Sequence, residues 1–309
     1  MSEHSHSRNV ALTLGSGGAR GLAHIGAIEE IERRGYRITS LSGCSMGSLI
    51  GGIYAAGKLH EARAWFSSLT RQQVLSLTDF SIGLSHVVKG DRVMQAIQEW
   101  VPDCAIETLP IPLTLVATDI IHSREVLFRS GSLFEAIRAS ISIPLCFEPV
   151  QWQDTLLVDG GLCNPLPLNR VARREGDLLV GVNISGRSVM QKVSQETWTL
   201  PDSPAVLDKL GSIGDKMEHA WQWVANSLDS SRQNDGPATP TAFELLNRTI
   251  DLQIQANCRL MTELMKPDIV VEMAQDEYTT FDFDRATEII DKGRTLMAYA
   301  LDKYEEREA

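Results

Sequence analysis

A chain of 309 residues with 43% hydrophobic and 22% charged side chains has the composition of a soluble globular protein and can bury a sizeable core. Its formal net charge of -11 argues against nucleic acid as a partner, because binding to phosphate backbones needs clustered Lys and Arg. The same charge gives no attraction to anionic membranes, so any contact with lipid is expected to be apolar.

Apolar, β-branched runs alternate with helical patterns along most of the chain. Strands are expected at residues 10–15, near residue 40, and at 112–120, 155–161, 178–185 and 268–273. The first helix, from about Ala19 to a stop at Gly35, carries leucine or isoleucine at three-residue steps. Continuous apolar strands separated by helices predict an α/β fold with a mainly parallel sheet that is covered on both faces.

From residue 187 to residue 240 the sequence becomes polar and Pro-bearing and loses its strand signals. This stretch is expected to be an insertion containing one helix, and its tryptophans suit a lid, a membrane-facing rim or a dimer contact. A second long helix is expected at 241–265, and a third from about Phe283 to the end of the chain.

Residues 43–47, Gly-Cys-Ser-Met-Gly, match the pattern Gly-X-Ser-X-Gly at the point where a strand should pass into a helix. In this context Gly43 and Gly47 permit a sharp turn that exposes Ser45 as a nucleophile. The small residues of the helix that follows allow it to lie close to the sheet, and its N-terminal dipole favours negative charge at Ser45.

A second glycine-rich turn, Gly15-Ser-Gly-Gly-Ala-Arg-Gly21, lies earlier in the chain. It fits a dinucleotide fingerprint poorly, because Arg20 stands where Gly-X-Gly-X-X-Gly needs its third glycine, and it lacks the Lys-Ser/Thr ending of a phosphate-binding loop. Its consecutive small residues would leave backbone N–H groups uncovered at a helix N-terminus, as an oxyanion hole requires. The two turns are therefore expected to face one substrate.

A serine nucleophile needs a base. The histidines after Ser45 lack the small turn residues that would present them at a strand end: His60, His86, His122 and His219. His24 is close to the glycine-rich turn and is either a second base or, as we favour, a helix residue packed near the site. Asp159 directly follows an apolar strand and precedes two glycines, at the edge where α/β sites form; taken alone, it is better explained as a turn residue.

The five cysteines are odd in number and widely spaced, which predicts reduced, mostly buried thiols and no zinc site. No feature calls for a metal or an organic cofactor, and His4 and His6 are expected to belong to a disordered tail rather than a metal site. With no signal peptide and no run of about 18 apolar residues, we expect a cytoplasmic protein, peripheral at the inner membrane where it meets lipid.

Together, GSGGARG at 15–21, GCSMG at 43–47 and DGG at 159–161 resemble the motifs of the bacterial patatin-like phospholipases, particularly the branch similar to the neuropathy target esterase catalytic domain. The segment Ala139–Pro144 resembles a further recurrent stretch of that family. The resemblance covers residues 9–185 well and the C-terminal third loosely. It implies a three-layer α/β/α fold and a single hydrolase domain over 1–309, with the insertion at about 187–240.

The resemblance also implies a Ser-Asp dyad, with Ser45 as nucleophile and Asp159 as its direct base, acting on lipid esters through an acyl-enzyme. Gly17, Gly18, Ala19 and Arg20 would form the oxyanion hole, and Arg20 would shape the loop or meet an anionic head group. The chain departs from the family pattern at Gly15, where many members have Asp, and at Cys44, where many have Thr.

Three alternatives stay open at this point: a non-catalytic lipid- or nucleotide-binding protein on the same fold, a Ser45–Asp159–His219 triad, and Cys44 as the nucleophile. The acyl-chain preference, the head group and the oligomeric state are also left open.

Overall fold

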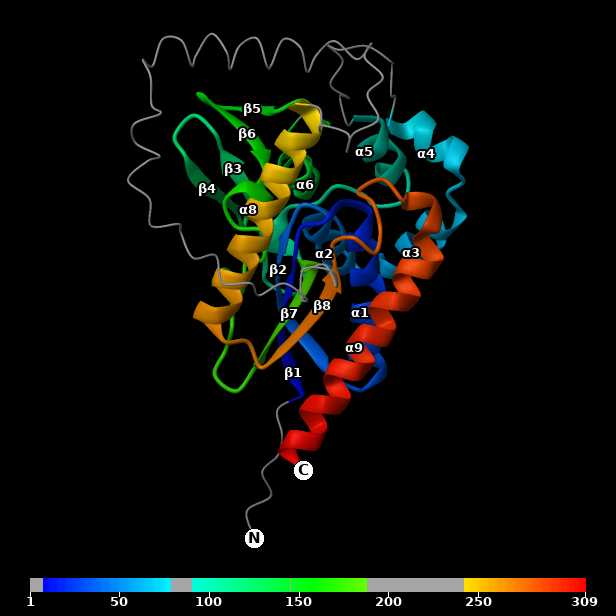
Figure 1. Cartoon of the computed structure of the whole chain (residues 1–309), viewed down its shortest axis with the longest axis vertical. Helices are drawn as coiled ribbons and strands as arrows, with labels where there is room; N and C mark the ends of the chain where they lie inside the picture. Colours follow the sequence, from blue (N-terminus) through cyan, green and yellow to red (C-terminus); the bar gives the residue numbers. More distant parts are fainter. Residues whose placement is uncertain (1–7, 79–90, 145, 188–241) are drawn as a thin grey trace, which may run out of the picture. The chain divides into compact units, whose positions relative to one another are not determined.

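A computed structural model describes residues 8–78, 91–144, 146–187 and 242–309, and shows one mixed sheet with helices packed on it (Figure 1). The strands are β1 Asn9–Leu14, β2 Arg37–Cys44, β3 Leu113–Asp119, β4 Arg124–Phe128, β5 Val150–Trp152, β6 Thr155–Asp159, β7 Leu178–Gly186 and β8 Ile269–Ala274. All six predicted strands are confirmed. The short strands β4 and β5 were not predicted.

The sheet order is β5-β6-β3-β2-β1-β7-β8, with β4 also paired to β3. The pairs β3–β2, β2–β1, β1–β7 and β7–β8 are parallel, whereas β3–β4, β3–β6 and β5–β6 are antiparallel. The α/β class with a mainly parallel sheet is therefore confirmed. The strand β6, predicted at 155–161, is one of those that run antiparallel to their neighbours. β6 also forms a hairpin with the short strand β5.

Two strands of opposite direction share one edge of β3. β4 pairs with Leu115–Asp119 on the other edge, which leaves the first edge to β2 opposite Leu113–Val116 and then to β6 opposite Ala117–Asp119. Cys44 is opposite Val116 and Asp159 is opposite Ala117. The ends of β2 and β6 therefore meet head to head beside β3.

The helices and 3-10 turns fill most of the remaining described chain. They are η1 Gly18–Leu22, α1 Ala23–Arg33, α2 Met46–Ala55, α3 Leu59–Ser68, α4 Arg71–Thr78, α5 Asp91–Gln98, η2 Ile106–Thr108, α6 Leu133–Ser140, η3 Gly160–Leu162, α8 Ala242–Met265, η6 Phe283–Arg285 and α9 Ala286–Glu308. The predicted first helix is confirmed as η1 followed by α1, and the predicted helices at 241–265 and from Phe283 are confirmed as α8 and α9.

Alternate side chains of the central strands enter two different cores. On one face, Leu12 of β1 and Val180 of β7 pack with α1, α2, α6 and α9 in the larger core. On the other face, Ala11 and Leu179 pack with Cys258 and neighbouring residues of α8. This alternation is what a sheet covered on both faces requires, since successive side chains of a strand point to opposite sides.

By its internal contacts the chain divides into two compact units, residues 1–189 with 254–309, and residues 190–253. Of the second unit the structure describes only 242–253, the first half of α8, so the predicted insertion at about 187–240 lies almost wholly outside the described residues. The five cysteines are free, and Cys44 and Cys258 are buried while the other three are half-buried. None of the described helices is both long and apolar enough to cross a bilayer.

Candidate active site

Ser45 occupies a tight turn between β2 and α2. Its φ of 55° and ψ of -123° lie outside the regions that L-residues favour, a conformation that costs on the order of 1–3 kcal/mol and persists only when its surroundings hold it. Its two flanking glycines make the turn possible. A Cβ on Gly47 would lie 2.1 Å from the Leu14 carbonyl oxygen, and one on Gly43 would lie 2.5 Å from the Gly47 carbonyl oxygen.

Asp159 ends β6, and its carboxylate meets the serine. The Ser45 Oγ–H donates to Asp159 Oδ2 over 2.5 Å, and the Gly161 N–H donates to Oδ1 over 2.7 Å. Asp159 is 5% exposed. Burial raises the pKa of this carboxyl from its ordinary 3.8 to about 6, against the lowering effect of the two hydrogen bonds. A carboxylate with a pKa near 6 is ionised at neutral pH and can still accept and return a proton.

The glycine loop, residues 15–21, runs from β1 into η1 beside this pair. Its first two amides are already bonded, because Gly15 N–H donates to the Val182 carbonyl and Ser16 N–H to that of Pro165. The Ala19 N–H donates to the Thr280 carbonyl over 2.9 Å. These three amides are therefore not free to meet a phosphate or an oxyanion, so the Ala19 N–H does not suit the role of an oxyanion donor.

The N–H groups of Gly17 and Gly18 are the other two candidate donors of the loop. Within the described part of the chain, no carbonyl or side-chain oxygen is bonded to their N–H groups. Gly18 has a φ of +58° and lines the same pocket as Ser45. A Cβ there would lie 2.5 Å from Thr280 Cγ2 and 2.8 Å from the Thr280 carbonyl oxygen, so the loop tip has no room for a side chain.

Arg20 is buried below the loop. Its guanidinium donates to the carbonyl oxygens of Ile184, Gln275 and Tyr278 at 3.0, 3.1 and 2.8 Å, and the residue is 5% exposed. Of the two roles expected for Arg20, this geometry suits the shaping of the loop rather than contact with a head group.

In the described part of the chain no histidine is hydrogen-bonded to Ser45 or Asp159. His24 is fully buried, and its Nε2–H donates to the Gly15 carbonyl over 2.8 Å, so it supports the glycine loop from below. Burial lowers the pKa of His24 to about 4. His60 is exposed on α3, and the half-exposed His122 bonds Asp119. His86 and His219 lie outside the described residues, as do His4 and His6.

Cys44, adjacent to the nucleophile, is fully buried, with Sγ 4.0 Å from Asp159 Oδ1. Burial and the charge of Asp159 raise the pKa of its thiol well above its ordinary value. A nucleophilic cysteine needs the thiolate form and access to substrate, so this environment argues against Cys44 as the nucleophile.

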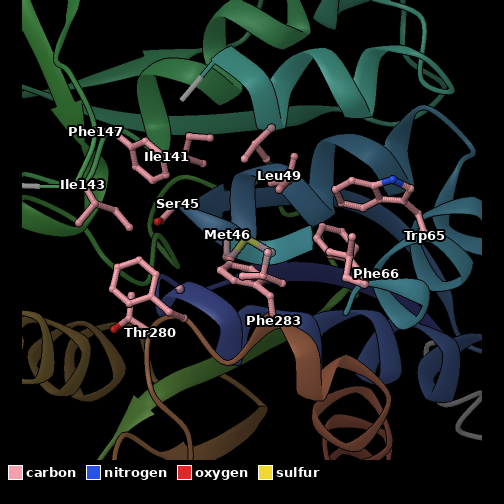
Figure 2. A pocket seen from close by; sticks show the side chains of 15 residues that line it. Ser45, Met46, Leu49, Trp65, Phe66, Ile141, Ile143, Phe147, Thr280 and Phe283 are labelled. Carbon is pink, nitrogen blue, oxygen red and sulfur yellow. The ribbon is translucent and has the colours of Figure 1, made fainter. Parts of the chain in front are cut away.

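Ser45 lines an apolar pocket (Figure 2). Its walls come from α2, from α3 and α4, from the segment after α6 and from the turn before α9. In Figure 2, Trp65 of α3 lies at the end away from Ser45, with Leu49 and Phe66 between them. All of the pocket's exposed lining is apolar, so it suits a hydrocarbon chain rather than a charged group.

Several residues of the site were not assigned a role from the sequence. Ser140 and Ser142 lie in the segment 139–144, which was noted for its resemblance alone, and they bond the backbones of Ser45 and Asp159 respectively. Thr280, which holds Ala19 and lines the pocket, gives no sequence signal, because it is separated from the glycine loop by most of the chain. Among the described residues no group of three His, Cys, Asp or Glu side chains could hold a metal ion.

Comparison with known proteins places these features in a family. The model of the patatin-like phospholipase family matches residues 12–172. An uncharacterized NTE family protein of Mycobacterium bovis is 34% identical over 97% of this chain and 93% of its own length, and a Mycobacterium tuberculosis protein of the same description matches equally well.

More distant similarities agree in part. Neuropathy target esterase sws of Drosophila persimilis is 34% identical over 52% of this chain but only 12% of its own length. The crystal structure of VipD from Legionella pneumophila is 15% identical, with a TM-score of 0.53 over 97% of this chain and 67% of that chain, a likeness of fold alone. The family match spans both glycine-rich turns and the DGG segment, so the chain belongs to the patatin-like phospholipase family.

Proposed function

We propose that the protein is a serine acyl hydrolase that cleaves lipid acyl esters, a phospholipase, lysophospholipase or carboxylesterase, through a Ser45–Asp159 dyad. The observation that carries this proposal is the hydrogen bond of 2.5 Å between the Ser45 hydroxyl and a buried carboxylate at the base of an apolar pocket. Membership in the patatin-like phospholipase family supports a lipid acyl hydrolase in general.

The proposed reaction has two halves. In the first, Asp159 accepts the Ser45 proton as Oγ attacks the ester carbonyl carbon, the Gly17 and Gly18 amides bind the oxyanion, and the departing alcohol takes the proton from Asp159. In the second, Asp159 accepts a proton from water as the water attacks the acyl-enzyme, and then returns it to Ser45 Oγ when the fatty acid leaves.

The pocket supports an acyl substrate over a polar one. In the acyl-enzyme the carbonyl carbon would be bonded to Ser45 Oγ, and the acyl chain would extend from it into a space with apolar walls. Buried apolar surface stabilises such a chain by about 0.8 kcal/mol for each methylene group. The alcohol portion would therefore face solvent or a lipid surface, where its head group need not lose its water.

The experiment that tests the nucleophile is labelling with a fluorophosphonate, followed by mass spectrometry of the adduct. We expect the label on Ser45, and we expect Ser45→Ala to lose both labelling and hydrolysis of p-nitrophenyl esters. A label on another serine, or full activity in the variant, would contradict the assignment. A protein that takes no label but binds lipid would instead be a non-catalytic member of the fold.

The same assay separates a dyad from a triad. Asp159→Asn is expected to lower kcat/KM nearly as far as Ser45→Ala, because an amide cannot accept the serine proton. Single alanine substitutions of His24, His60, His86, His122 and His219 should each retain substantial activity. A fall of about 10³-fold in one folded histidine variant, checked by circular dichroism, would show a triad, in which the imidazole takes the proton.

A further inference from the structure

The short segment at the end of α6, residues 140–142, touches the backbones of both proposed dyad residues. The Ser45 N–H donates to Ser140 Oγ over 2.9 Å, and the Asp159 N–H donates to the Ser142 carbonyl over 2.9 Å. Ser140 and Ser142 are both fully buried. Ser45 and Asp159, which lie far apart in the sequence, are thus both bonded to one short segment, through Ser140 and Ser142.

The bonding of Ser140 can be assigned from elementary chemistry. Its hydroxyl lies 2.5 Å from the Val116 carbonyl, 2.7 Å from Ser48 Oγ and 2.9 Å from the Ser45 nitrogen. A carbonyl only accepts, so Ser140 must donate its single proton to Val116. Its two lone pairs then accept from the Ser48 hydroxyl and the Ser45 amide, and every hydrogen-bonding position of Ser140 is used.

Ser140 is fixed next to the point where Ser45 and Asp159 meet. Val116 is on β3 opposite Cys44, and its neighbour Ala117 is opposite Asp159. Ser140 is therefore anchored to the strand along which β2 and β6 meet, and from that point it holds the peptide nitrogen of Ser45. Because the Ser45 φ of 55° is unfavourable for an L-residue, this peptide needs partners that hold it in place.

Ser142 is bonded to Asp159 through its backbone carbonyl. Its own side chain is fixed by Arg138, whose Nη1 donates to Ser142 Oγ over 2.7 Å while that hydroxyl donates to the Arg138 carbonyl over 2.8 Å. The Ser142 carbonyl is thereby directed at the Asp159 amide. Substitution of the Ser142 side chain would leave this backbone bond in place. The hold on the proposed dyad can therefore be tested at Ser140, whose contact with Ser45 is made by its side chain.

We propose that Ser140 is a positioning residue for the nucleophile, whose hydroxyl holds the strained Ser45 peptide so that Ser45 Oγ stays within hydrogen-bonding distance of Asp159. The proposal rests on the proposed dyad, and it assigns a role to the segment 139–144 that the dyad itself does not use. Ser140 touches neither substrate nor a reacting atom, so it acts only through Ser45.

Ser140→Ala and Ser48→Ala form a matched pair for the test. Each removes one buried hydroxyl of the same network, and only Ser140→Ala removes the acceptor of the Ser45 amide. We expect Ser140→Ala to lower kcat on a soluble p-nitrophenyl ester, and the rate of fluorophosphonate labelling, by about 10- to 100-fold with KM within about twofold, since small misplacements have effects of this size. Ser48→Ala should stay within about threefold of the parent protein.

A second readout does not depend on activity. Amide hydrogen exchange at Ser45, followed by NMR with ¹⁵N-serine labelling, should be at least about tenfold faster in Ser140→Ala than in Ser48→Ala. If the parent protein hydrolyses no ester and takes no label at Ser45, the proposed function fails, and the exchange rates still decide whether Ser140 holds the turn.

Three results would overturn the proposal: a folded Ser140→Ala variant with kcat within about threefold of the parent protein, an equal loss of kcat in Ser48→Ala, or unchanged exchange at Ser45. If Ser140→Ala does not fold, Ser140→Cys takes its place, because sulfur fills the site but is a weak acceptor. A folded Ser140→Cys variant with the parent's kcat and labelling rate would also overturn it.

Discussion

Asp159 combines two properties that are usually in conflict, a charge in the resting state and almost complete burial. Its pKa is about 6 because burial acts more strongly than the hydrogen bonds from Ser45 and Gly161. Ionising it in the folded protein is therefore harder than ionising it in the unfolded chain. The proposed base is held in place at some expense of stability, as is common for functional groups.

This conflict predicts a pH dependence of stability. Between about pH 4 and pH 6 the folded protein binds more protons at Asp159 than the unfolded chain does, so the free energy of unfolding falls as the pH rises. A rise in pKa from 3.8 to about 6 corresponds to a loss of about 3 kcal/mol once the pH exceeds 6. Below about pH 4 this loss is absent.

Urea unfolding of the parent protein and of Asp159→Asn, at intervals from pH 4 to pH 7.5, measures this contribution. The Asn variant has no ionisable group at 159, so the difference between the two proteins should change by about 3 kcal/mol in favour of the variant as the pH rises. All other titrating groups are common to both proteins and cancel. A difference that does not vary with pH would show that Asp159 ionises as easily in the folded protein as in water.

The helix α3 supplies the wall of the pocket that lies farthest from Ser45. Trp65 lies there, packed edge-on against Phe66 with ring centres 4.8 Å apart, at the end away from Ser45 (Figure 2). An acyl chain that starts at Ser45 would lengthen toward this indole. Trp65 is therefore positioned to limit the length of chain that the pocket can bury.

If the protein has the proposed activity, Trp65→Ala should extend the range of acyl chains that it accepts. In the parent protein, kcat/KM on p-nitrophenyl esters is expected to rise up to about fourfold for each added methylene, from about 0.8 kcal/mol each, until the chain meets the indole. In Trp65→Ala that rise should continue to longer chains. Trp152→Ala is the matched control, since Trp152 packs on Phe128 outside the pocket. An unchanged chain-length profile would place the acyl chain elsewhere.

Elements set by local sequence could be predicted, whereas those set by contacts between distant parts of the chain could not. β2 and the turn at Gly43–Gly47 were predictable because a buried strand, two close-packed glycines and the helix that follows are local in sequence. The direction of β6 was not, because it is defined by pairing with β3, about 40 residues earlier in the chain, which leaves no local pattern. The bond from Ala19 to the Thr280 carbonyl was equally hidden, because it joins opposite ends of the chain.

At the scale of the whole molecule, the C-terminal part completes a site whose motifs all lie in the first 161 residues. β8 extends the sheet beside β7, and α9 packs against α1 (Figure 1). Thr280 and Phe283, in the turn between β8 and α9, line the same pocket as Ser45. The family match ends at residue 172, whereas the described core also includes buried residues of β7, β8 and α9.

A chain of residues 1–189, which keeps every motif, is therefore expected not to fold. Among the buried core side chains of β8 and α9 that it would lack are Ile269, Val271, Ile289, Ile290 and Met297. At about 2 kcal/mol each they contribute roughly 10 kcal/mol, which is comparable with the whole stability of a typical domain. Circular dichroism and fluorophosphonate labelling check the expectation; cooperative unfolding with a label on Ser45 in this fragment would contradict it.

The solitary charge of Asp159 has a consequence for how the reaction distributes electric charge. The groups that set its pKa are burial, a hydroxyl and an amide, so its negative charge is held by neutral dipoles. When Asp159 takes the serine proton and the substrate oxygen becomes negative, no new ion pair is created. One unit of negative charge moves from Asp159 to the substrate oxygen, and neutral hydrogen-bond donors hold it in both places. A Ser-His-Asp site instead separates charge, because its imidazole becomes a cation opposite the oxyanion. The proposed dyad therefore shifts a single negative charge between Asp159 and the substrate oxygen without creating a positive partner for it.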